Sequence, residues 1–378
     1  MESVCYFGLD AEAVIHPMKL VIVYSRVYEY AMGKPKRVGG AERQQWLLAC
    51  ALTQAGWDVT IGVRQGLRQG ERVVIDRVHF VGMESGPFIW SCFRFLLSEQ
   101  PNWWYWRVAE HWLGPAVEIA KLVGVKTIFA AAFDTDVEPR HALVRRPTLW
   151  PLYAWGLARV DRIFVQHGGQ LERLPTQWQG KASVVPSLSG KLCYGFPHSE
   201  RKGYVVWVGT LRQPKRADLL IEIARRLPEV KFIVCGGISS WRSTPDYGRQ
   251  IVQGLSELSN VNYMGQMDPE ITQQIIGEAG ILLSTSDGEG FPNTFLEAWS
   301  SGTPVVSLKI DPDDVIQRKG LGVVARNLDF AISSIKHFLA SPSLRDEMGE
   351  RARRYVQENH GESNAIKIFG DAIRGISR

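Results

Sequence analysis

Two glutamates eight positions apart, Glu289 and Glu297, stand in the segment 284–306, which reads STSDGEGFPNTFLEAWSSGTPVV. Glu289 falls in a loop rich in Ser, Asp and Gly, where Gly290 lets the backbone approach a ligand closely. Pro292 is placed to begin a helix, and Glu297 follows within that helix. A carboxylate in this position is suited to accept two hydrogen bonds from a diol. The segment therefore predicts a ligand site where a strand, a glycine loop and a helix meet.

The beginning of the predicted helix supplies the second part of this site. Asn293 and Thr294 fall in its first turn, where backbone N–H groups lack partners within the helix. Such a helix N-terminus binds phosphate well. A diphosphate there would leave Glu297 close enough to reach a ribose hydroxyl pair. Isolated glutamates are more simply solvated loop or surface acids, but the residues around this pair favour a nucleotide site.

A second segment, 206–216 (VWVGTLRQPKR), combines a strand with a tight turn and basic side chains. A cation at the carboxyl end of a strand is well placed to neutralise a diphosphate leaving group. Lys215 is the first candidate for this role and Arg212 the second. A solvated basic loop is the alternative, and the sequence leaves it open, above all for Arg212.

Two further segments are candidates for substrate contact. Gly40 lies in a Gly-Gly-Ala-Glu run that opens a predicted helix, which is weak evidence alone because a glycine pair also forms simple turns. Asp134 and Asp136 form an Asp-x-Asp triplet at the end of a predicted strand. Hard divalent cations prefer such oxygen ligands, but we do not favour a metal site here. Asp134 is a candidate to contact a sugar or an acceptor, and a turn or helix cap is an equally good interpretation of it.

The elements that must position these residues alternate between buried, β-branched strands and amphipathic helices. The predicted strands span 20–24, 59–63, 126–133, 162–165, 182–185, 204–208, 231–235, 281–285 and 305–308. One predicted helix opens at 39–42 and ends at Gly56, and further predicted helices span 149–159, 218–227, 291–301 and 343–376. This alternation predicts an α/β protein whose parallel sheets carry helices on both faces.

The chain of 378 residues exceeds what one hydrophobic core usually supports. The strand–helix alternation also stops and restarts, which predicts an N-terminal Rossmann-like domain at 1–190, a linker at 191–203 and a second Rossmann-like domain at 204–360. A C-terminal helix at 361–378 is placed to pack back on the first domain, and residues 1–17 are expected to form a weakly ordered extension. Two doubly wound units are expected to face each other across a cleft, where ligands bind in such folds.

Net charge and cysteine content limit the classes of function that this sequence supports. The net charge of +5 suits an anionic ligand or an anionic membrane surface. We find no dense Lys/Arg stripe, so we expect no nucleic-acid partner. Five dispersed cysteines without a CxxC pair indicate reduced thiols in a cytoplasmic protein. We also expect no signal peptide and no spanning helix.

Tryptophan is concentrated in the first half of the chain, with ten of the 13 residues before position 180. The simpler interpretation is core packing, because aromatic side chains bury large areas. The alternative is an amphipathic surface, including 88–97 (FIWSCFRFLL), that meets a membrane or a sugar acceptor.

The paired glutamates around GFPNTFLEA resemble the motif of glycosyltransferase family 4, the glycosyl transferases group 1. The resemblance runs from about Lys19 to the C-terminal helix and is densest from Val206 to Val324. It implies a GT-B fold, retention of anomeric configuration, and no essential metal or other cofactor. It also implies that Glu297 binds the donor ribose and that Glu289 faces the transferred sugar.

The resemblance assigns further roles residue by residue. Gly40 matches the glycine that approaches the donor phosphate, and Lys215 matches the family's lysine. Thr210 departs from the pattern, because the family usually has Arg there, and Arg212 is the candidate to compensate. Asp134 stands where many members have His. The segments 105–107 and 166–170 resemble acceptor-side loops. The implied catalytic residues are Glu289, Lys215 and Asp134. The implied donor-binding residues are Gly40, Gly209, Thr210, Arg212, Lys215, Gly290, Phe291, Pro292, Asn293, Thr294 and Glu297.

The function that the resemblance implies is transfer of a sugar from a nucleoside-diphosphate sugar to a hydroxyl of a glycan, a lipid-linked or a small-molecule acceptor. The setting would be polysaccharide or glycolipid biosynthesis in the cytoplasm, with peripheral contact at the inner face of the membrane. One rival hypothesis is a non-catalytic nucleotide-sugar-binding partner of another transferase, which the Thr210 departure keeps open. Another is a different GT-B enzyme, such as a glycan phosphorylase or a sugar-nucleotide epimerase.

Overall fold

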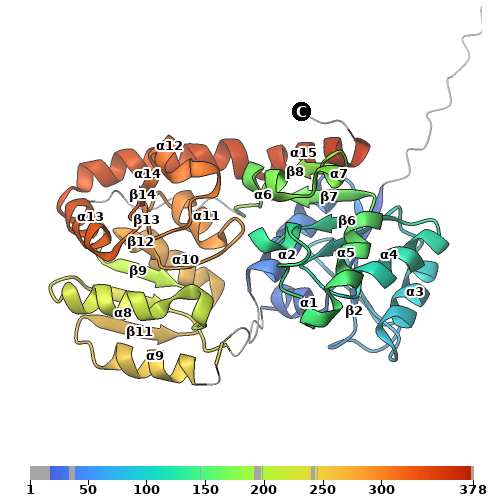
Figure 1. Ribbon diagram of the computed structural model, residues 1–378, viewed down its shortest axis with the longest axis horizontal. Helices are drawn as coiled ribbons and strands as arrows, with labels where there is room; N and C mark the ends of the chain where they lie inside the picture. The colour runs from blue at the N-terminus through green and yellow to red at the C-terminus, as the bar shows by residue number, and fades with distance from the viewer. Residues whose placement is uncertain are drawn as a thin grey trace, which may run out of the picture.

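The computed structural model describes residues 18–33, 39–144, 146–190, 197, 199–239, 243–244 and 246–375, which form two parallel-sheet units (Figure 1). We call the unit built on β1–β8 the N-terminal unit and the unit built on β9–β14 the C-terminal unit. The predicted extension 1–17 and residues 191–196 and 198 of the predicted linker lie outside the described residues. The predicted domain boundaries therefore stay predictions.

The described part of the N-terminal unit contains an eight-stranded sheet in the order β3-β4-β2-β1-β5-β6-β7-β8. Its strands are β1 Lys19–Val23, β2 Asp58–Val63, β3 Arg72–Ile75, β4 Val78–Gly82, β5 Trp103–Arg107, β6 Lys126–Ala130, β7 Arg162–Val165 and β8 Ala182–Val184. Neighbouring strands are parallel except β3 and β4, which form an antiparallel hairpin. The hairpin turns at Asp76 and Arg77, both at positive φ (47° and 67°), as a tight two-residue turn requires.

The described part of the C-terminal unit contains a six-stranded parallel sheet in the order β11-β10-β9-β12-β13-β14. Its strands are β9 Val205–Val208, β10 Phe232–Cys235, β11 Val261–Gly265, β12 Ile281–Ser284, β13 Val305–Ser307 and β14 Gly322–Val324. The strand order reverses between β9 and β12. Ligands of doubly wound folds bind outside the carboxyl ends of the strands at such a point, and both candidate segments from the sequence follow these two strands.

Helices cover both sheets (Figure 1). Those of the N-terminal unit are α1 Ser25–Ala31, α2 Gly40–Gln54, α3 Phe88–Glu99, α4 Leu113–Leu122, α5 Trp150–Arg159, α6 Gly168–Arg173 and α7 Thr176–Gln179, with 3-10 turns η1 Asp134–Val137 and η2 Pro147–Leu149. Those of the C-terminal unit are α8 Ala217–Arg226, α9 Tyr247–Ser256, α10 Pro269–Glu278, α11 Asn293–Ser300, α12 Val315–Lys319 and α13 Leu328–Ala340, with η3 Gln213–Lys215 and η4 Pro312–Asp314.

The last two helices, α14 (Pro342–His360) and α15 (Glu362–Arg374), tie the units together. α14 packs on α11 of the C-terminal unit. α15 returns to the N-terminal unit, where Phe369 is fully buried in the same cluster as Leu20 and Ile22 of β1. Figure 1 shows the two red helices crossing from one unit to the other. The chain thus passes between the units a second time at Gly361, which separates α14 from α15.

The predicted fold class is confirmed, because two doubly wound parallel sheets are present. Several short elements were missed, among them β3, β4, β11, β14 and α13. The predicted strand 126–133 was too long, because β6 ends at Ala130. The chain leaves the sheet there because the Asp136 carboxylate accepts the backbone N–H groups of Ala132 and Phe133 (2.8 and 2.9 Å) and starts η1.

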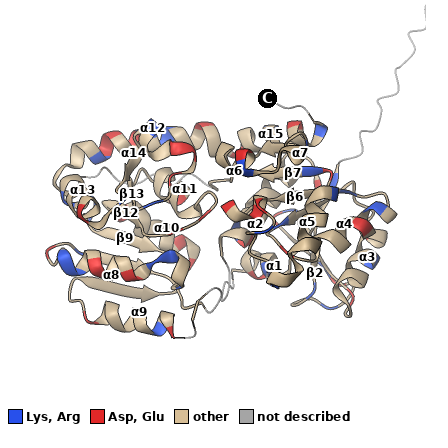
Figure 2. Ribbon diagram, viewed as in Figure 1, with Lys and Arg blue, Asp and Glu red and all other residues tan. Residues whose placement is uncertain are grey.

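The tryptophan-rich region mainly serves the core. Residues 103–107 form strand β5, and Trp103, Trp104 and Tyr105 are buried in it. The segment 88–97 belongs to α3, whose buried face includes Cys92, while Trp90 remains 52% exposed. No helix among the described residues has the length and apolar character needed to cross a membrane. Acidic and basic residues are interspersed over both units (Figure 2).

Candidate active site

Helix α11 begins where the sequence predicted. Pro292 is the N-cap residue, and Asn293 and Thr294 form the first turn. Phe295 and Trp299 are fully buried, with ring centroids 5.4 Å apart, and they fix the helix in the core of the C-terminal unit. Phe291 packs its ring 6.2 Å from that of Trp299. The Phe291 side chain is thus part of the support of the helix start, and its predicted role in donor binding stays a prediction.

Lys215 and Glu289 come together at the carboxyl ends of β9 and β12. The Lys215 ammonium group is ion-paired with the Glu289 carboxylate, and both side chains are largely buried. The Trp207 indole N–H donates to the Thr285 hydroxyl (2.9 Å), and that hydroxyl donates to the Lys215 carbonyl (2.7 Å). The two strands therefore hold the Lys215 backbone, and the ion pair with Glu289 holds its ammonium group.

Arg212 directly precedes η3, and its side chain lies near the Lys215–Glu289 ion pair. Its guanidinium carbon lies 5.9 Å from the centroid of the Phe133 ring, which belongs to the other unit. Burial lowers the pKa of Arg212, and the nearby Glu289 carboxylate acts in the opposite direction. Arg212, Lys215 and Glu289 are thus close enough to interact. Thr210, the departure from the family pattern, lies between Gly209 and Leu211 just after β9, and its side chain is partly exposed.

Glycine at position 40 brings α2 of the N-terminal unit against the start of α11. A Cβ on Gly40 would overlap the side-chain nitrogen of Asn293. The next turn of α2 adds two contacts: the Gln44 side-chain amide donates to Asn293 Oδ1 (2.8 Å), and Arg43 Nε lies 3.2 Å from Glu297 Oε1. The sequence interpretation missed Arg43 and Gln44. Their spacing in the sequence could have identified them, because residues three and four positions after Gly40 lie on the same face of the helix.

Glycine at position 290 allows an equally close approach. A Cβ there would overlap Gln166 Oε1 and lie 2.6 Å from the Ala132 carbonyl oxygen. Gln166 Oε1 also accepts the Phe291 backbone N–H (3.2 Å), and the Glu289 carbonyl accepts the Asp134 backbone N–H (3.3 Å). The glutamate loop of the C-terminal unit is therefore held directly against the N-terminal unit.

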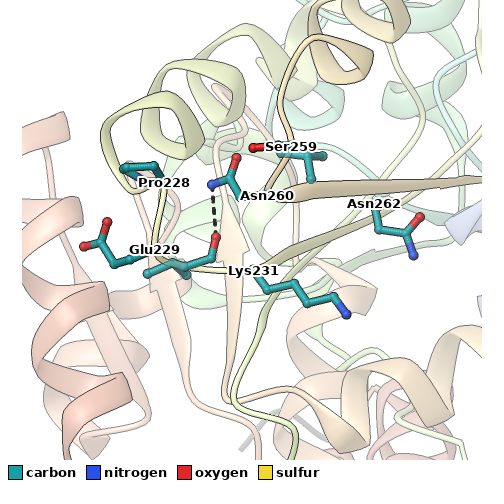
Figure 3. Close-up of a pocket in the computed structure, with 8 residues that line it drawn as sticks. Pro228, Glu229, Lys231, Ser259, Asn260 and Asn262 are labelled. Atoms are coloured by element: carbon teal, nitrogen blue, oxygen red, sulfur yellow. Dashed lines mark hydrogen bonds between the residues drawn. The ribbon is translucent and has the colours of Figure 1, made fainter.

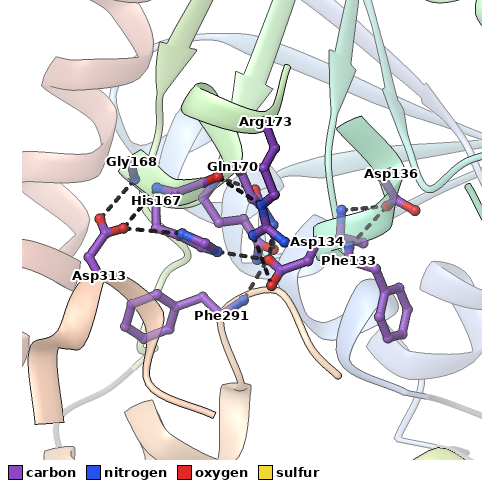
Figure 4. A network of polar contacts seen from close by, with 12 residues as sticks. Phe133, Asp134, Asp136, His167, Gly168, Gln170, Arg173, Phe291 and Asp313 are labelled. Atoms are coloured by element: carbon purple, nitrogen blue, oxygen red, sulfur yellow. Dashed lines mark hydrogen bonds and ion pairs between the residues drawn. The ribbon is translucent and has the colours of Figure 1, made fainter. Parts of the chain in front are cut away.

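Asp134 is the centre of a polar network on the N-terminal side (Figure 4). Its carboxylate is 2.9 Å from His167 Nε2, 3.0 Å from Arg173 Nη2 and 3.1 Å from the Gln170 side-chain nitrogen. Burial raises the pKa of Asp134, but hydrogen bonds from His167 and Arg173 outweigh it and leave the pKa below its usual value. The Asp136 carboxylate instead accepts the backbone N–H groups of Ala132 and Phe133, just before η1, so the two acids of the Asp-x-Asp triplet have separate partners.

Asp313 extends this network to the C-terminal unit. Its carboxylate accepts the backbone N–H groups of Gly168 and Gly169 (2.8 and 2.9 Å) and lies 3.3 Å from His167 Nδ1 (Figure 4). Asp313 has φ 53°, a left-handed conformation that a non-glycine residue rarely adopts. His167 is thus flanked by one carboxylate from each unit. The sequence analysis did not single out Asp313, which lies seven positions after the segment 284–306.

A surface hollow of about 320 Å³ lies elsewhere in the described part of the chain. It is lined by Pro228–Lys231 and Ser259–Asn262 at the amino ends of β10 and β11 (Figure 3). Asn260 closes its wall by donating to the carbonyl of Val230 (3.0 Å). The predicted residues gather at the opposite, carboxyl ends of the strands. We place the candidate active site with them, because their polar groups converge there.

Solved structures resemble the whole described arrangement. Sucrose-phosphate synthase from Thermosynechococcus elongatus superposes with a TM-score of 0.74 at 17% identity, covering 94% of this chain and 98% of that chain. Anabaena HepE, solved in complex with UDP and glucose, gives a TM-score of 0.74 at 14% identity, covering 94% and 99%. At these identities the likeness shows the fold, which is GT-B.

Curated relatives and a family model identify the sequence relationship. Alpha-galactosylglucosyldiacylglycerol synthase from Streptococcus pneumoniae is 27% identical over 173 residues, covering 46% of each chain. D-inositol 3-phosphate glycosyltransferase from Mycolicibacterium gilvum is 26% identical over 233 residues, covering 57% of this chain and 50% of the relative. The matches thus span about half the length of these relatives. The model for glycosyl transferases group 1 matches residues 202–340. This C-terminal region therefore resembles the glycosyl transferases group 1 family.

Proposed function

We propose that the protein is a glycosyltransferase that moves a sugar from a nucleoside-diphosphate sugar to an acceptor hydroxyl. The observation that carries the proposal is the convergence of the Lys215–Glu289 ion pair with the start of α11, which bears Glu297. A helix start and a cation bind phosphate, and a carboxylate binds a diol, so the three together match a nucleotide sugar. The named activities of the relatives support this assignment.

Each part of the donor has a proposed partner. The diphosphate lies at the first turn of α11, near Asn293 and Thr294, with Lys215 and Arg212 neutralising its charge. The ribose hydroxyls donate to Glu297. Glu289, held by Lys215, faces the transferred sugar. The ordered loop after β9 and the backbone at Gly209 border the nucleotide, and no metal is assigned a step in this proposal.

The proposed reaction retains the anomeric configuration. The bond between the anomeric carbon and the diphosphate oxygen breaks as the acceptor oxygen forms its bond on the same face. The acceptor proton passes to the departing diphosphate, so no base from the protein is needed. Lys215, Arg212 and the helix start lower the barrier because they stabilise charge that grows on the leaving group. Asp134, oriented by His167 and Arg173, contacts the sugar or the acceptor.

The acceptor class follows from the relatives rather than from the site. One relative is named for a diacylglycerol glycolipid and others for inositol 3-phosphate. We propose a glycolipid or polysaccharide precursor as acceptor. A non-catalytic nucleotide-sugar-binding subunit is not favoured, because these relatives are named as synthases or transferases, and the Lys215–Glu289 pair is present despite Thr210.

A nucleotide panel tests the proposal. One nucleoside diphosphate among UDP, GDP and ADP, or its sugar, is expected to raise the melting temperature by a few degrees. A ligand that binds only the native state adds about 2.7 kcal/mol of stability at 100 times its Kd. Thermal unfolding with each nucleotide measures the shift, and release of the nucleoside diphosphate from the selected sugar measures turnover. A chain that none of these ligands stabilises would contradict the proposed function.

A further inference from the structure

Two adjacent residues of α2 contact the two polar side chains that α11 presents to the N-terminal unit. Arg43 Nε lies 3.2 Å from Glu297 Oε1, and the Gln44 amide donates to Asn293 Oδ1 at 2.8 Å. Asn293 and Glu297 are four positions apart, so they lie on one face of the helix. The residues proposed to bind the nucleotide are therefore the same ones that α2 contacts.

Arg43 is itself fixed from several sides. Its Nη2 donates to the Ser189 carbonyl (2.6 Å), and the Tyr30 side chain hydrogen-bonds to it. Gly190, at φ 79°, lets the backbone pass close to the guanidinium, because a Cβ there would lie 3.2 Å from Nη2. Fixing a long arginine side chain in this way costs conformational entropy. The contacts therefore hold the guanidinium in one direction, towards Glu297.

Glu297 depends on Arg43 for its charge compensation. The titratable groups that face it are Arg43 from α2, Lys215 from η3 and Tyr30 from α1. Burial raises the pKa of Glu297, and Arg43 followed by Lys215 acts against that rise. The Lys215 ammonium group is already ion-paired with Glu289. Arg43 therefore provides the direct ion pair that favours the ionised carboxylate.

We propose that Arg43 is a positioning residue for the donor, which holds the Glu297 carboxylate in the ionised state and orientation that accept the ribose hydroxyls. The contact to Arg43 uses Oε1, and a carboxylate has further acceptor sites for two hydroxyl groups. Because Arg43 belongs to the N-terminal unit, nucleotide binding by the C-terminal unit depends on contact between the units. The inference rests on the proposed function and names the residue that completes its ribose site.

Calorimetric titration with UDP, GDP and ADP, each compared with its 2′-deoxy form, tests this role. For the nucleotide that wild type binds best, Arg43→Met is expected to raise Kd about tenfold at pH 7, the effect of losing a hydrogen bond to a charged group. The variant should also lose the preference for ribose over 2′-deoxyribose. Without the arginine the pKa of Glu297 rises further, so binding by the variant should strengthen more than binding by wild type as the pH is raised.

Three further proteins separate positioning from a general structural effect. Arg43→Lys keeps the charge and should lose less affinity. Arg159→Met removes an arginine of the same unit that pairs with Glu118 on the surface (Nε to Oε1 2.8 Å) and should bind as wild type does. The double variant Arg43→Met, Glu297→Gln should bind no more weakly than Glu297→Gln alone. Melting temperatures of all variants check that each remains folded.

The outcomes are distinct. Unchanged affinity, ribose preference and pH dependence in Arg43→Met would overturn the inference while leaving the proposed function in place. Additive losses in the double variant would also overturn it, because Arg43 would then act independently of Glu297. If wild type binds none of the nucleotides, the proposed function falls, and this inference falls with it.

Discussion

Replacing Lys215 by methionine is expected to lower kcat by about 10²–10³-fold, the loss typical of removing one group that stabilises transition-state charge. Negative charge on the diphosphate grows as its bond to the sugar breaks, so the lysine contributes more in the transition state than in the bound donor. KM should therefore change less than kcat. Release of nucleoside diphosphate from the donor selected by the thermal panel provides the measurement.

Lys215→Met also breaks the ion pair with Glu289, so control variants must separate loss of catalysis from loss of stability. Lys215→Met leaves Glu289 largely buried without its cation, and breaking such a pair is destabilising. Lys215→Arg keeps the charge and should retain part of the activity. Lys336→Met removes another lysine of the C-terminal unit, paired with Glu229 on the surface at 3.1 Å, and should leave kcat unchanged. Wild-type turnover by a folded Lys215→Met protein would show that this lysine has no role in catalysis.

The local part of the site could be predicted from the sequence. Proline fixes its own backbone angle, so the helix start at Pro292 was visible in one residue, and it placed Asn293 and Thr294 in the first turn. Buried apolar runs in the sequence predicted the strand before Glu289 and the strand before Lys215. Because carboxyl ends of parallel strands share one edge, convergence of Lys215 and Glu289 followed from the topology.

The contacts between the units could not be predicted in the same way. Gln44 meets Asn293 across 249 positions of sequence, and Asp313 meets Gly168 across 145. A periodic sequence pattern does not predict contacts between residues so far apart in the chain, because these contacts depend on how the two sheet units pack against each other. Asp313 also adopts a left-handed backbone conformation, which its residue type alone does not predict. Arg43 was within reach of sequence reasoning only through its helical spacing from Gly40.

The aromatic strand β5 shows a different limit. A run such as Trp103 to Arg107 satisfies the pattern of a buried strand and of an exposed aromatic surface equally well. What decides is whether helices cover both faces of the sheet. β1 and β6 pair with β5 along its two edges. Trp103 and Tyr105 pack in one cluster with Phe369 of α15, and Trp104 packs in another with Cys92 of α3. The sequence analysis recognised β1 but not β5. Composition alone could not distinguish the two cases.

Gly290→Ala is expected to reduce donor turnover by about 10²-fold, the cost of a misplacement of about 1 Å between reacting groups. The new methyl group would overlap Gln166 Oε1 and lie 2.6 Å from the Ala132 carbonyl oxygen. The glutamine side chain can move, but the Ala132 carbonyl is part of the backbone just before Asp134, so relief of this clash must shift either that backbone or the loop that carries Glu289. We therefore expect the glutamate loop to be displaced from Asp134, whose backbone N–H donates to the Glu289 carbonyl.

A matched glycine two positions earlier gives the control. A Cβ on Gly288 would meet no atom within 4 Å, so Gly288→Ala should keep wild-type turnover although it changes the same loop. Nucleoside diphosphate binding by Gly290→Ala should fall less than turnover, because the clash lies against the N-terminal unit and not at Glu297. Gln166→Ala combined with Gly290→Ala should restore activity only in part, since the Ala132 carbonyl remains. Equal activity of the two single glycine variants would show that close contact of this loop with the N-terminal unit is not needed for transfer.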